Sequence, residues 1–214
     1  MLKFKELLQL LAIVVIELPL EILGYIVVPI ALAFCNKQSE HLPKWVRYFE
    51  DASDYYNGEN SAINGDSGWR KEHYPNGKNR TYFARLLWLY RNRIGYFSSR
   101  VNGVKVSEID PSSVRVQGNI KVTSNGGVIS DFCKVTCKLK NGRTRFGLYK
   151  TIRYKGIFSG FYCRIYVGWK LLDVAEMNEY NKATFMQPDD KAFLKSVWCV
   201  NPFKRVQGSD NAKP

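Results

Sequence analysis

The side chains of this sequence best suited to acid–base chemistry are its two histidines, His41 and His73. An imidazole changes its charge near neutral pH, which makes it a common proton-transfer group. His73 follows Glu72 in a turn-rich segment, so it could act as an acid or base. The sequence contains no Gly-x-Ser-x-Gly, P-loop or dinucleotide-binding motif. A lone histidine more often has no special role, so we expect a binding protein without a cofactor rather than an enzyme.

The cysteines are the other reactive side chains. Their number is odd, and they form no dense framework, which is typical of free thiols in a reducing compartment. Cys133 and Cys137 are four apart on an expected strand and therefore point to one face. With only two histidines in the chain, we expect no metal site. The five cysteines are Cys35, Cys133, Cys137, Cys163 and Cys199.

The chain is strongly basic. Lys and Arg total 32 and Asp and Glu total 19, so the formal net charge is +13. The excess lies outside an apolar segment near the N-terminus. Such a balance favours anionic partners, namely phospholipid head groups, nucleic acid or an acidic protein, although an inert basic surface is the alternative.

Residues 132–172 contain no Asp or Glu and alternate between apolar and polar side chains. If the apolar set faces the core, the opposite sheet face carries only basic and aromatic side chains. Like charges on neighbouring strands repel, so an anionic partner bound to this face would reduce the repulsion between its basic side chains. Aromatic residues among basic ones suit stacking on bases or insertion among head groups. The residues expected on this face are Lys134, Lys138, Lys140, Arg143, Arg145, Tyr149, Arg153, Tyr162, Arg164, Tyr166 and Lys170.

A 28-residue run from Leu7 to Phe34 contains only two charged residues, Glu17 and Glu21. About 20 apolar residues span a bilayer as a helix, so the run predicts a membrane anchor. It is too long for the apolar region of a signal peptide, and no small-residue cleavage site follows it. We therefore expect an uncleaved transmembrane or membrane-embedded helix.

The two carboxyls lie one helical turn apart, with Pro19 between them. We expect them to face another subunit or protein, because a carboxyl in lipid is unfavourable, and a homo-oligomer through this helix face is one candidate. The favoured structure is a tilted spanning helix; the alternative is two arms, 7–16 and 22–34, in one leaflet. Lys37, Lys44 and Arg47 follow the segment, which favours a cytoplasmic C-terminal domain.

The rest of the chain predicts an α+β fold. Residues 81–93 have helical apolar spacing, with Arg80, Arg85, Arg91 and Arg93 on the polar side. From Val114 the period changes to two, and Asn141-Gly142 marks a hairpin. We expect an antiparallel β-meander or small barrel with one or two amphipathic helices. The expected division is an anchor (1–35), a turn-rich connecting segment (36–79), a basic helix with the β domain (80–206) and a flexible tail (207–214).

Four motifs resemble an uncharacterised family of tailed-bacteriophage membrane proteins: GDSGWRKEH (65–73), NRTYFARLLWLYRNRIGY (79–96), GWKLL (168–172) and NPFK (201–204). The resemblance covers most of the chain but not residues 98–130. It implies a phage-encoded protein. The family has no established activity, so the resemblance assigns no catalytic role to any residue of this sequence. The most distinctive motif contains Asp66, Trp69, Arg70, Glu72 and His73, which either pack a turn or build a binding loop.

Together these observations lead us to expect a protein anchored in the inner membrane of a bacterial host. Its domain would face the cytoplasm and bind anionic lipid, a host protein or a phage protein, in host takeover, counter-defence or superinfection exclusion. One alternative is a virion component that acts in assembly or genome delivery. The other is a membrane-tethered nucleic-acid binder that uses the basic sheet face.

Overall fold

The computed structural model describes residues 2–52, 62–74, 81–119, 131–172 and 193–205. Its contacts divide the chain into two compact units, and each is described by itself. Unit 1 comprises residues 1–11, 106–187 and 196–214, and unit 2 comprises residues 12–105 and 188–195. The expected anchor, residues 1–35, contributes to both units. The expected tail, 207–214, lies outside the described residues.

The apolar N-terminal run forms one continuous helix, α1 (Phe4–Ala33), with Pro19 and Pro29 inside it. It is therefore not divided into the two arms that Pro19 suggested. By length and composition alone, α1 is able to cross a membrane. Residues 4–11 belong to unit 1 and residues 12–33 to unit 2.

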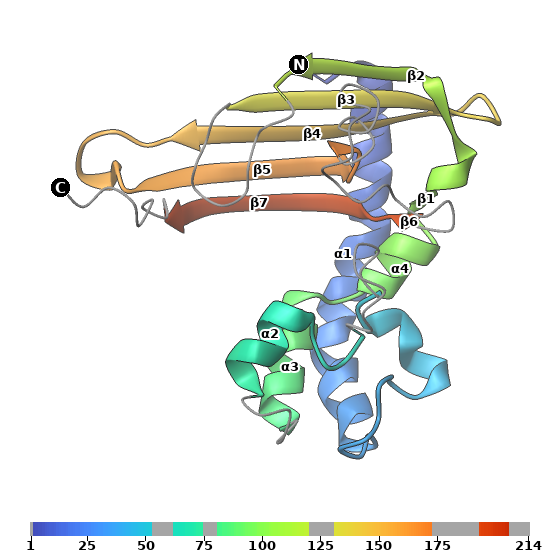
Figure 1. Ribbon diagram of the computed structural model, residues 1–214, viewed down its shortest axis with the longest axis vertical. Coiled ribbons are helices and arrows are strands. Elements are labelled where there is room, and N and C mark those ends of the chain that lie inside the picture. The colour runs from blue at the N-terminus through green and yellow to red at the C-terminus, as the bar shows by residue number, and fades with distance from the viewer. Residues whose placement is uncertain (1, 53–61, 75–80, 120–130, 173–192, 206–214) are drawn as a thin grey trace. The chain divides into compact units, whose positions relative to one another are not determined.

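Unit 1 contains an antiparallel sheet of five strands, which confirms the α+β class and the meander (Figure 1). The strand order is β2-β3-β4-β5-β7, and the described strands form an open sheet rather than a closed barrel. The strands are β2 (Ile109–Gly118), β3 (Phe132–Leu139), β4 (Thr144–Arg153), β5 (Phe161–Trp169) and β7 (Ser196–Arg205), with short 3-10 helices η3 (Val106–Glu108) and η4 (Gly156–Phe158).

The hairpin expected at Asn141-Gly142 connects β3 to β4. Gly142 has a φ of 83°, which a residue with a Cβ rarely adopts. Its N–H donates to the carbonyl of Leu139 at 2.8 Å and closes the turn. This turn sets the register, so that Lys138 lies opposite Thr144 and Lys134 lies opposite Leu148.

Residues directly opposite each other on neighbouring strands share a face of the sheet. The cysteine face carries the row Cys133, Tyr149, Tyr166 and Cys199. The other face, here called the helix face, carries the row Lys134, Leu148, Val167 and Trp198. Both faces contain buried side chains, including Cys133 and Tyr149 on the first and Lys134 and Val167 on the second.

Unit 2 is mainly helical around a small apolar core. Its core includes Val28 and Leu32 of α1 together with Leu42, Ile63 and Leu89. The helix expected at residues 81–93 is confirmed, and Thr81 caps it by accepting a hydrogen bond from the N–H of Ala84 at 3.2 Å. The elements are η1 (Lys44–Phe49), α2 (Ser67–His73), α3 (Tyr82–Arg91), α4 (Gly95–Arg100) and an antiparallel pair, β1 (Val104–Lys105) with β6 (Phe193–Leu194).

Candidate functional site

The outer side of α1 is an exposed apolar surface. Val15, Ile22 and Ile26 are 62%, 58% and 61% exposed, although each prefers an apolar environment. Soluble monomers rarely expose a contiguous apolar patch of more than about a few hundred Å², and larger ones mark binding to lipid or protein. The helix exposes further large apolar side chains, namely Phe4, Leu7, Leu8, Leu11, Ile16, Leu18, Leu23, Tyr25 and Ile30.

A narrow stripe on the opposite side of α1 is buried. From residue 12 onward it consists of Ile13, Glu17, Gly24, Val28, Ala31 and Leu32, whose spacing keeps them on one side of a helix. A Cβ at Gly24 would meet the side chain of Phe49 at 3.4 Å, so the glycine allows a close approach. The helix therefore has one protein-facing stripe and one open apolar side.

The two carboxyls within α1 have partners in the same chain. Glu17 is buried and accepts a hydrogen bond from Nδ2 of Asn102 at 3.0 Å. Glu21 lies 3.5 Å from Nη2 of Arg93, whose guanidinium also lies 4.2 Å from the centre of the Tyr25 ring. The helix face that was a candidate for a homo-oligomer is thus occupied by residues of unit 2.

Two tyrosines of α3 hold it against α1. Pro29 has no N–H, so the carbonyl of Tyr25 lacks its usual helical donor. The hydroxyl of Tyr90 donates to this carbonyl at 3.2 Å, and the hydroxyl of Tyr82 donates to the carbonyl of Pro29 at 3.0 Å. The proline thus creates an acceptor that the neighbouring helix uses.

Side chains of α3 and η1 add to the exposed apolar surface of unit 2. Phe83 and Leu87 of α3 are 72% and 56% exposed, and Trp45 and Tyr48 of η1 are 70% and 52% exposed. Tryptophan and tyrosine prefer the interface between water and lipid, where a ring lies in the apolar region and its polar atom in the head groups. The composition of this surface therefore suits a membrane boundary.

Arg85 does not lie on an exposed polar side of α3, as the helical pattern suggested, but is buried. Its Nε donates to the side-chain oxygen of Asn64 at 2.9 Å, and its Nη1 donates to the carbonyl of Asn36 at 2.7 Å. Its Nη2 donates to the carbonyls of Lys37 and Ser39 at 2.8 and 2.9 Å. These bonds satisfy a buried cation and fix the segment that follows α1.

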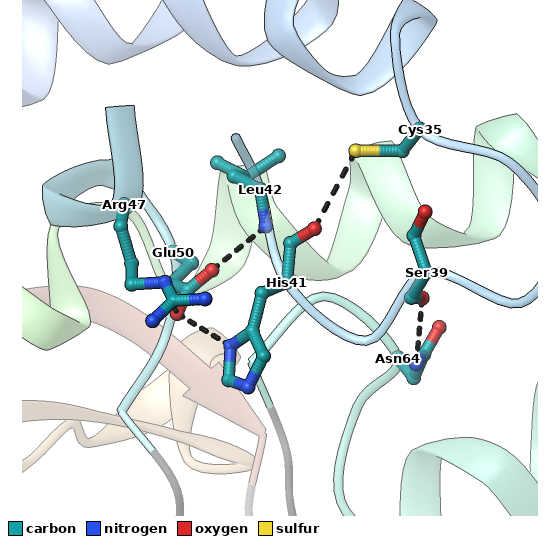
Figure 2. A network of polar contacts seen from close by, with 7 residues as sticks. All are labelled: Cys35, Ser39, His41, Leu42, Arg47, Glu50 and Asn64. Atoms are coloured by element: carbon teal, nitrogen blue, oxygen red, sulfur yellow. Dashed lines mark hydrogen bonds and ion pairs between the residues drawn. The ribbon is translucent and has the colours of Figure 1, made fainter. Parts of the chain in front are cut away.

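Glu50 is the centre of a second polar network in unit 2 (Figure 2). Its side chain is 1% exposed and lies 2.8 Å from Nδ1 of His41, 2.9 Å from the N–H of Leu42 and 3.6 Å from Nε of Arg47. Burial raises the pKa of this carboxyl, while the hydrogen bond from Leu42 and the contact with His41 act in the opposite direction. A carboxylate that orients an imidazole is common in acid–base sites. In this protein the Glu50 carboxylate also contacts Leu42 and Arg47, so a structural link across residues 41–50 explains it equally well.

The GDSGWRKEH motif forms the start and body of α2. Asp66 caps the helix, because its Oδ1 accepts the N–H of Trp69 at 2.7 Å. The Trp69 ring stacks on the ring of His73, with centroids 3.6 Å apart, and Nδ1 of His73 lies 3.2 Å from the carbonyl of Trp69. Glu72 is mostly exposed and lies 3.9 Å from His73, while Arg70 is a half-buried residue of the same helix. Helix capping and ring packing therefore explain most of the motif.

The register places the expected basic face on two sides of the sheet. Lys134 and Lys138 lie on the helix face, opposite Leu148 and Thr144. Lys134 is 3% exposed, and its Nζ contacts Glu6 of α1 at 2.7 Å. The prediction that all these residues share one face is therefore wrong, because a one-residue shift between β3 and β4 reverses the faces. Lys140 and Arg143 lie in the hairpin, and Lys170 follows β5; those on the cysteine face are Arg145, Tyr149, Arg153, Tyr162, Arg164 and Tyr166.

The middle of the cysteine face is partly buried and is not an open cationic surface, although Arg153 at the end of β4 is exposed. Tyr149 and Tyr162 are buried, and the rings of Tyr149 and Tyr166 are 5.2 Å apart. Nη2 of Arg164 lies 3.8 Å from Sγ of Cys199. Burial raises the pKa of the Tyr149 phenol, and the charge of Arg164 opposes this shift. Burial also raises the pKa of the Cys137 thiol to about 11, so this sulfur is a poor nucleophile.

Sequence reasoning missed the Glu50 network and the inward direction of Arg85. His41 and Glu50 are nine residues apart, a spacing that no helix or strand pattern brings together. A buried arginine that bonds to backbone carbonyls also leaves no sequence signal. Among the described residues, no group of three or more His, Cys, Asp or Glu side chains could hold a metal ion.

Searches of curated proteins and of solved structures found no match to this chain. One family model matches residues 1–207, which is almost the whole sequence. The chain therefore belongs to DUF7338, a family of unknown function.

Proposed function

We propose that this protein is a membrane-anchored binding protein that attaches to the bilayer through the outer side of α1. The observation that carries this proposal is the apolar side of α1, exposed from Phe4 to Ile30, while a stripe on its other side packs within the chain. An apolar surface of this extent is unfavourable in water and is expected to be buried against lipid or protein. A bilayer can bury it without a complementary protein surface.

The packing of unit 2 supports attachment along the membrane surface rather than across it. Glu17 and Glu21 lie in the middle of α1 and contact Asn102 and Arg93. If α1 spanned the bilayer in this packing, these polar groups and the irregular backbone around Arg93 would lie at membrane depth, which is unfavourable. If the helix lies in the interface, its apolar side meets the acyl chains and its polar contacts stay outside.

The net charge of +13 favours a membrane with anionic lipids. The resemblance to tailed-bacteriophage proteins suggests the setting that we propose, the inner membrane of an infected bacterium, with the sheet on the cytoplasmic side. There the protein would bind a host or phage component. A nucleic-acid role is less favoured, because the basic residues that motivated it are split between two faces and partly buried.

The test uses the full chain with vesicles of phosphatidylglycerol and phosphatidylethanolamine. The variant Val15→Lys, Ile22→Lys and Ile26→Lys places three charges on the outer side of α1, where they do not touch the buried stripe. The control replaces the same residues with Leu, which keeps the surface apolar. We expect the wild type and the control to float with the vesicles and the lysine variant to remain in solution.

Circular dichroism establishes whether the lysine variant keeps its secondary structure. Flotation of the folded lysine variant at the wild-type level would contradict attachment through this side of α1. A wild type that remains in solution as a large assembly would instead favour a particle component, in which neighbouring copies cover the helix.

A further inference from the structure

Unit 1 has a second exposed apolar surface, where β4 leads into β5 and β7 ends. We call it the distal tip and define it as Ile152, Ile157, Phe158, Val200 and Phe203. Ile157 is 92% exposed and Phe203 is 63% exposed, which is unusual for side chains of this size. Val200, Phe158 and Ile152 are 61%, 49% and 44% exposed. At least two of these side chains lie together, because the rings of Phe158 and Phe203 are 6.3 Å apart.

The distal tip is held in place by contacts within unit 1. The hydroxyl of Tyr154 donates to the carbonyl of Pro202 at 2.8 Å, which ties the end of β4 to β7. The ring of Phe203 lies 5.7 Å from that of Tyr154 and 6.3 Å from that of Phe158. Because these contacts already order the rings, binding would require little further loss of conformational freedom.

Basic side chains surround the distal tip. Lys150, Lys155 and Arg205 are exposed. Arg153 is also exposed, but its charge is offset by Asp131 at 4.0 Å. Lys150, Lys155 and Arg205 therefore give the described surroundings of the tip a positive charge. Apolar side chains with a cationic rim match a bilayer whose anionic phosphates lie above its acyl chains.

The register shows on which face the tip lies. Ile152 is opposite Cys163, and Val200 is opposite Ile165, both on the helix face. The same face carries Lys134, which contacts Glu6 in the first turns of α1. Ile152 is four residues beyond Leu148, the partner of Lys134, which is roughly 13 Å along the strand. Ile152 and Val200 thus continue the helix face beyond the row in which Lys134 contacts α1.

We propose that the distal tip is a second membrane-contact site, at which Ile157, Phe158 and Phe203 insert among anionic head groups. This inference rests on the proposed attachment through α1. It adds that the sheet itself lies against the bilayer, held at the first turns of α1 and at the tip. Two contacts would fix the orientation of the sheet, which one helix face alone does not do.

The experiment places an environment-sensitive nitrobenzoxadiazole label on the full chain at Ile157→Cys, with Cys35, Cys163 and Cys199 replaced by Ser. The control carries the label at Ser112→Cys, an exposed position on β2 at the opposite edge of the sheet. Phosphatidylglycerol vesicles are added, with and without brominated acyl chains as quenchers. We expect a blue shift and quenching at position 157 and an unchanged spectrum at position 112.

Flotation of the same samples separates the two proposals. If the protein floats but the label at 157 keeps its spectrum in water, the tip does not contact the membrane and this inference fails alone. If the protein does not float, the proposed function fails as well. A blue shift without vesicles, together with a dimer in sedimentation, would assign the tip to contacts between copies and would overturn the inference.

Discussion

At the scale of single residues, Glu50 makes the clearest prediction for stability. Its carboxylate accepts the buried N–H of Leu42 and contacts His41. Glu50→Ala leaves that N–H without its acceptor, which should lower the free energy of unfolding by about 1–3 kcal/mol. Urea unfolding of the full chain in detergent measures it. The control is Glu72→Ala, whose side chain is 76% exposed, with an expected change within about 0.5 kcal/mol. Equal effects of the two substitutions would refute a structural role for Glu50.

The same carboxyl predicts a pH dependence. Burial raises the pKa of Glu50, so the native state holds this proton more tightly than the unfolded chain. The contribution of Glu50 to the free energy of unfolding should therefore fall as the pH rises from the ordinary carboxyl pKa through the native one. Glu50→Gln cannot titrate, so the stability difference between wild type and variant should shrink over this range.

The GDSGWRKEH motif is visible in the sequence, but its helix is not, since residues 36–79 were expected to be turn-rich. The structure explains the motif by a helix cap at Asp66 and a ring stack between Trp69 and His73. The partners of Glu17 and Glu21 were not predictable, because Asn102 and Arg93 lie far away in the sequence. The sequence shows that a carboxyl in an apolar helix needs a partner, and only the fold shows which one.

At the scale of elements, the pair of Lys134 and Glu6 holds the first turns of α1 on the sheet. The lysine is almost fully buried, so Lys134→Met leaves the glutamate without its counter-ion in a largely buried place. We expect a loss of about 3 kcal/mol in the free energy of unfolding. Adding Glu6→Gln should restore most of it, because the unpaired charge is gone. Chemical unfolding of the single and double variants measures both effects.

Lys138→Met is the matched control for that pair. Lys138 lies on the same strand and face as Lys134 but is exposed. Its replacement should change stability by less than about 0.5 kcal/mol. A similar loss for both single variants, or no recovery in the double variant, would show that the ion pair does not hold α1 to the sheet.

The strands themselves were predictable, but one pairing between them was not. The faces expected for β4 and β5 agree with the structure, since Tyr149 lies opposite Tyr166 and Leu148 opposite Val167. The face expected for β3 was reversed, because both of its faces carry buried side chains, Cys133 on one and Lys134 on the other. Alternation shows which residues share a face within a strand. The hairpin at Gly142 decides how two strands are matched, and its geometry was not visible in the pattern.

At the scale of the whole molecule, the sequence indicated a membrane protein but favoured a spanning helix. The composition and length of α1 are compatible both with a helix that spans the bilayer and with one that lies in its interface. The difference comes from the polar partners of α1, such as Asn102, which periodicity does not reveal. The structure therefore changes the proposed mode of attachment rather than the proposed location.

The two modes of attachment predict opposite labelling patterns for the ends of α1. Single cysteines are introduced at Lys3 and at Gln38, exposed positions just before and after the helix, with Cys35, Cys163 and Cys199 replaced by Ser. Sealed inner-membrane vesicles of either orientation are treated with a membrane-impermeant maleimide, and detergent-opened vesicles give the full signal. A helix lying in the interface has both ends on one side, so both cysteines should react in vesicles of the same orientation. A spanning helix would expose them in vesicles of opposite orientation, and that result would require the contacts of Glu17 and Glu21 to open when the protein inserts.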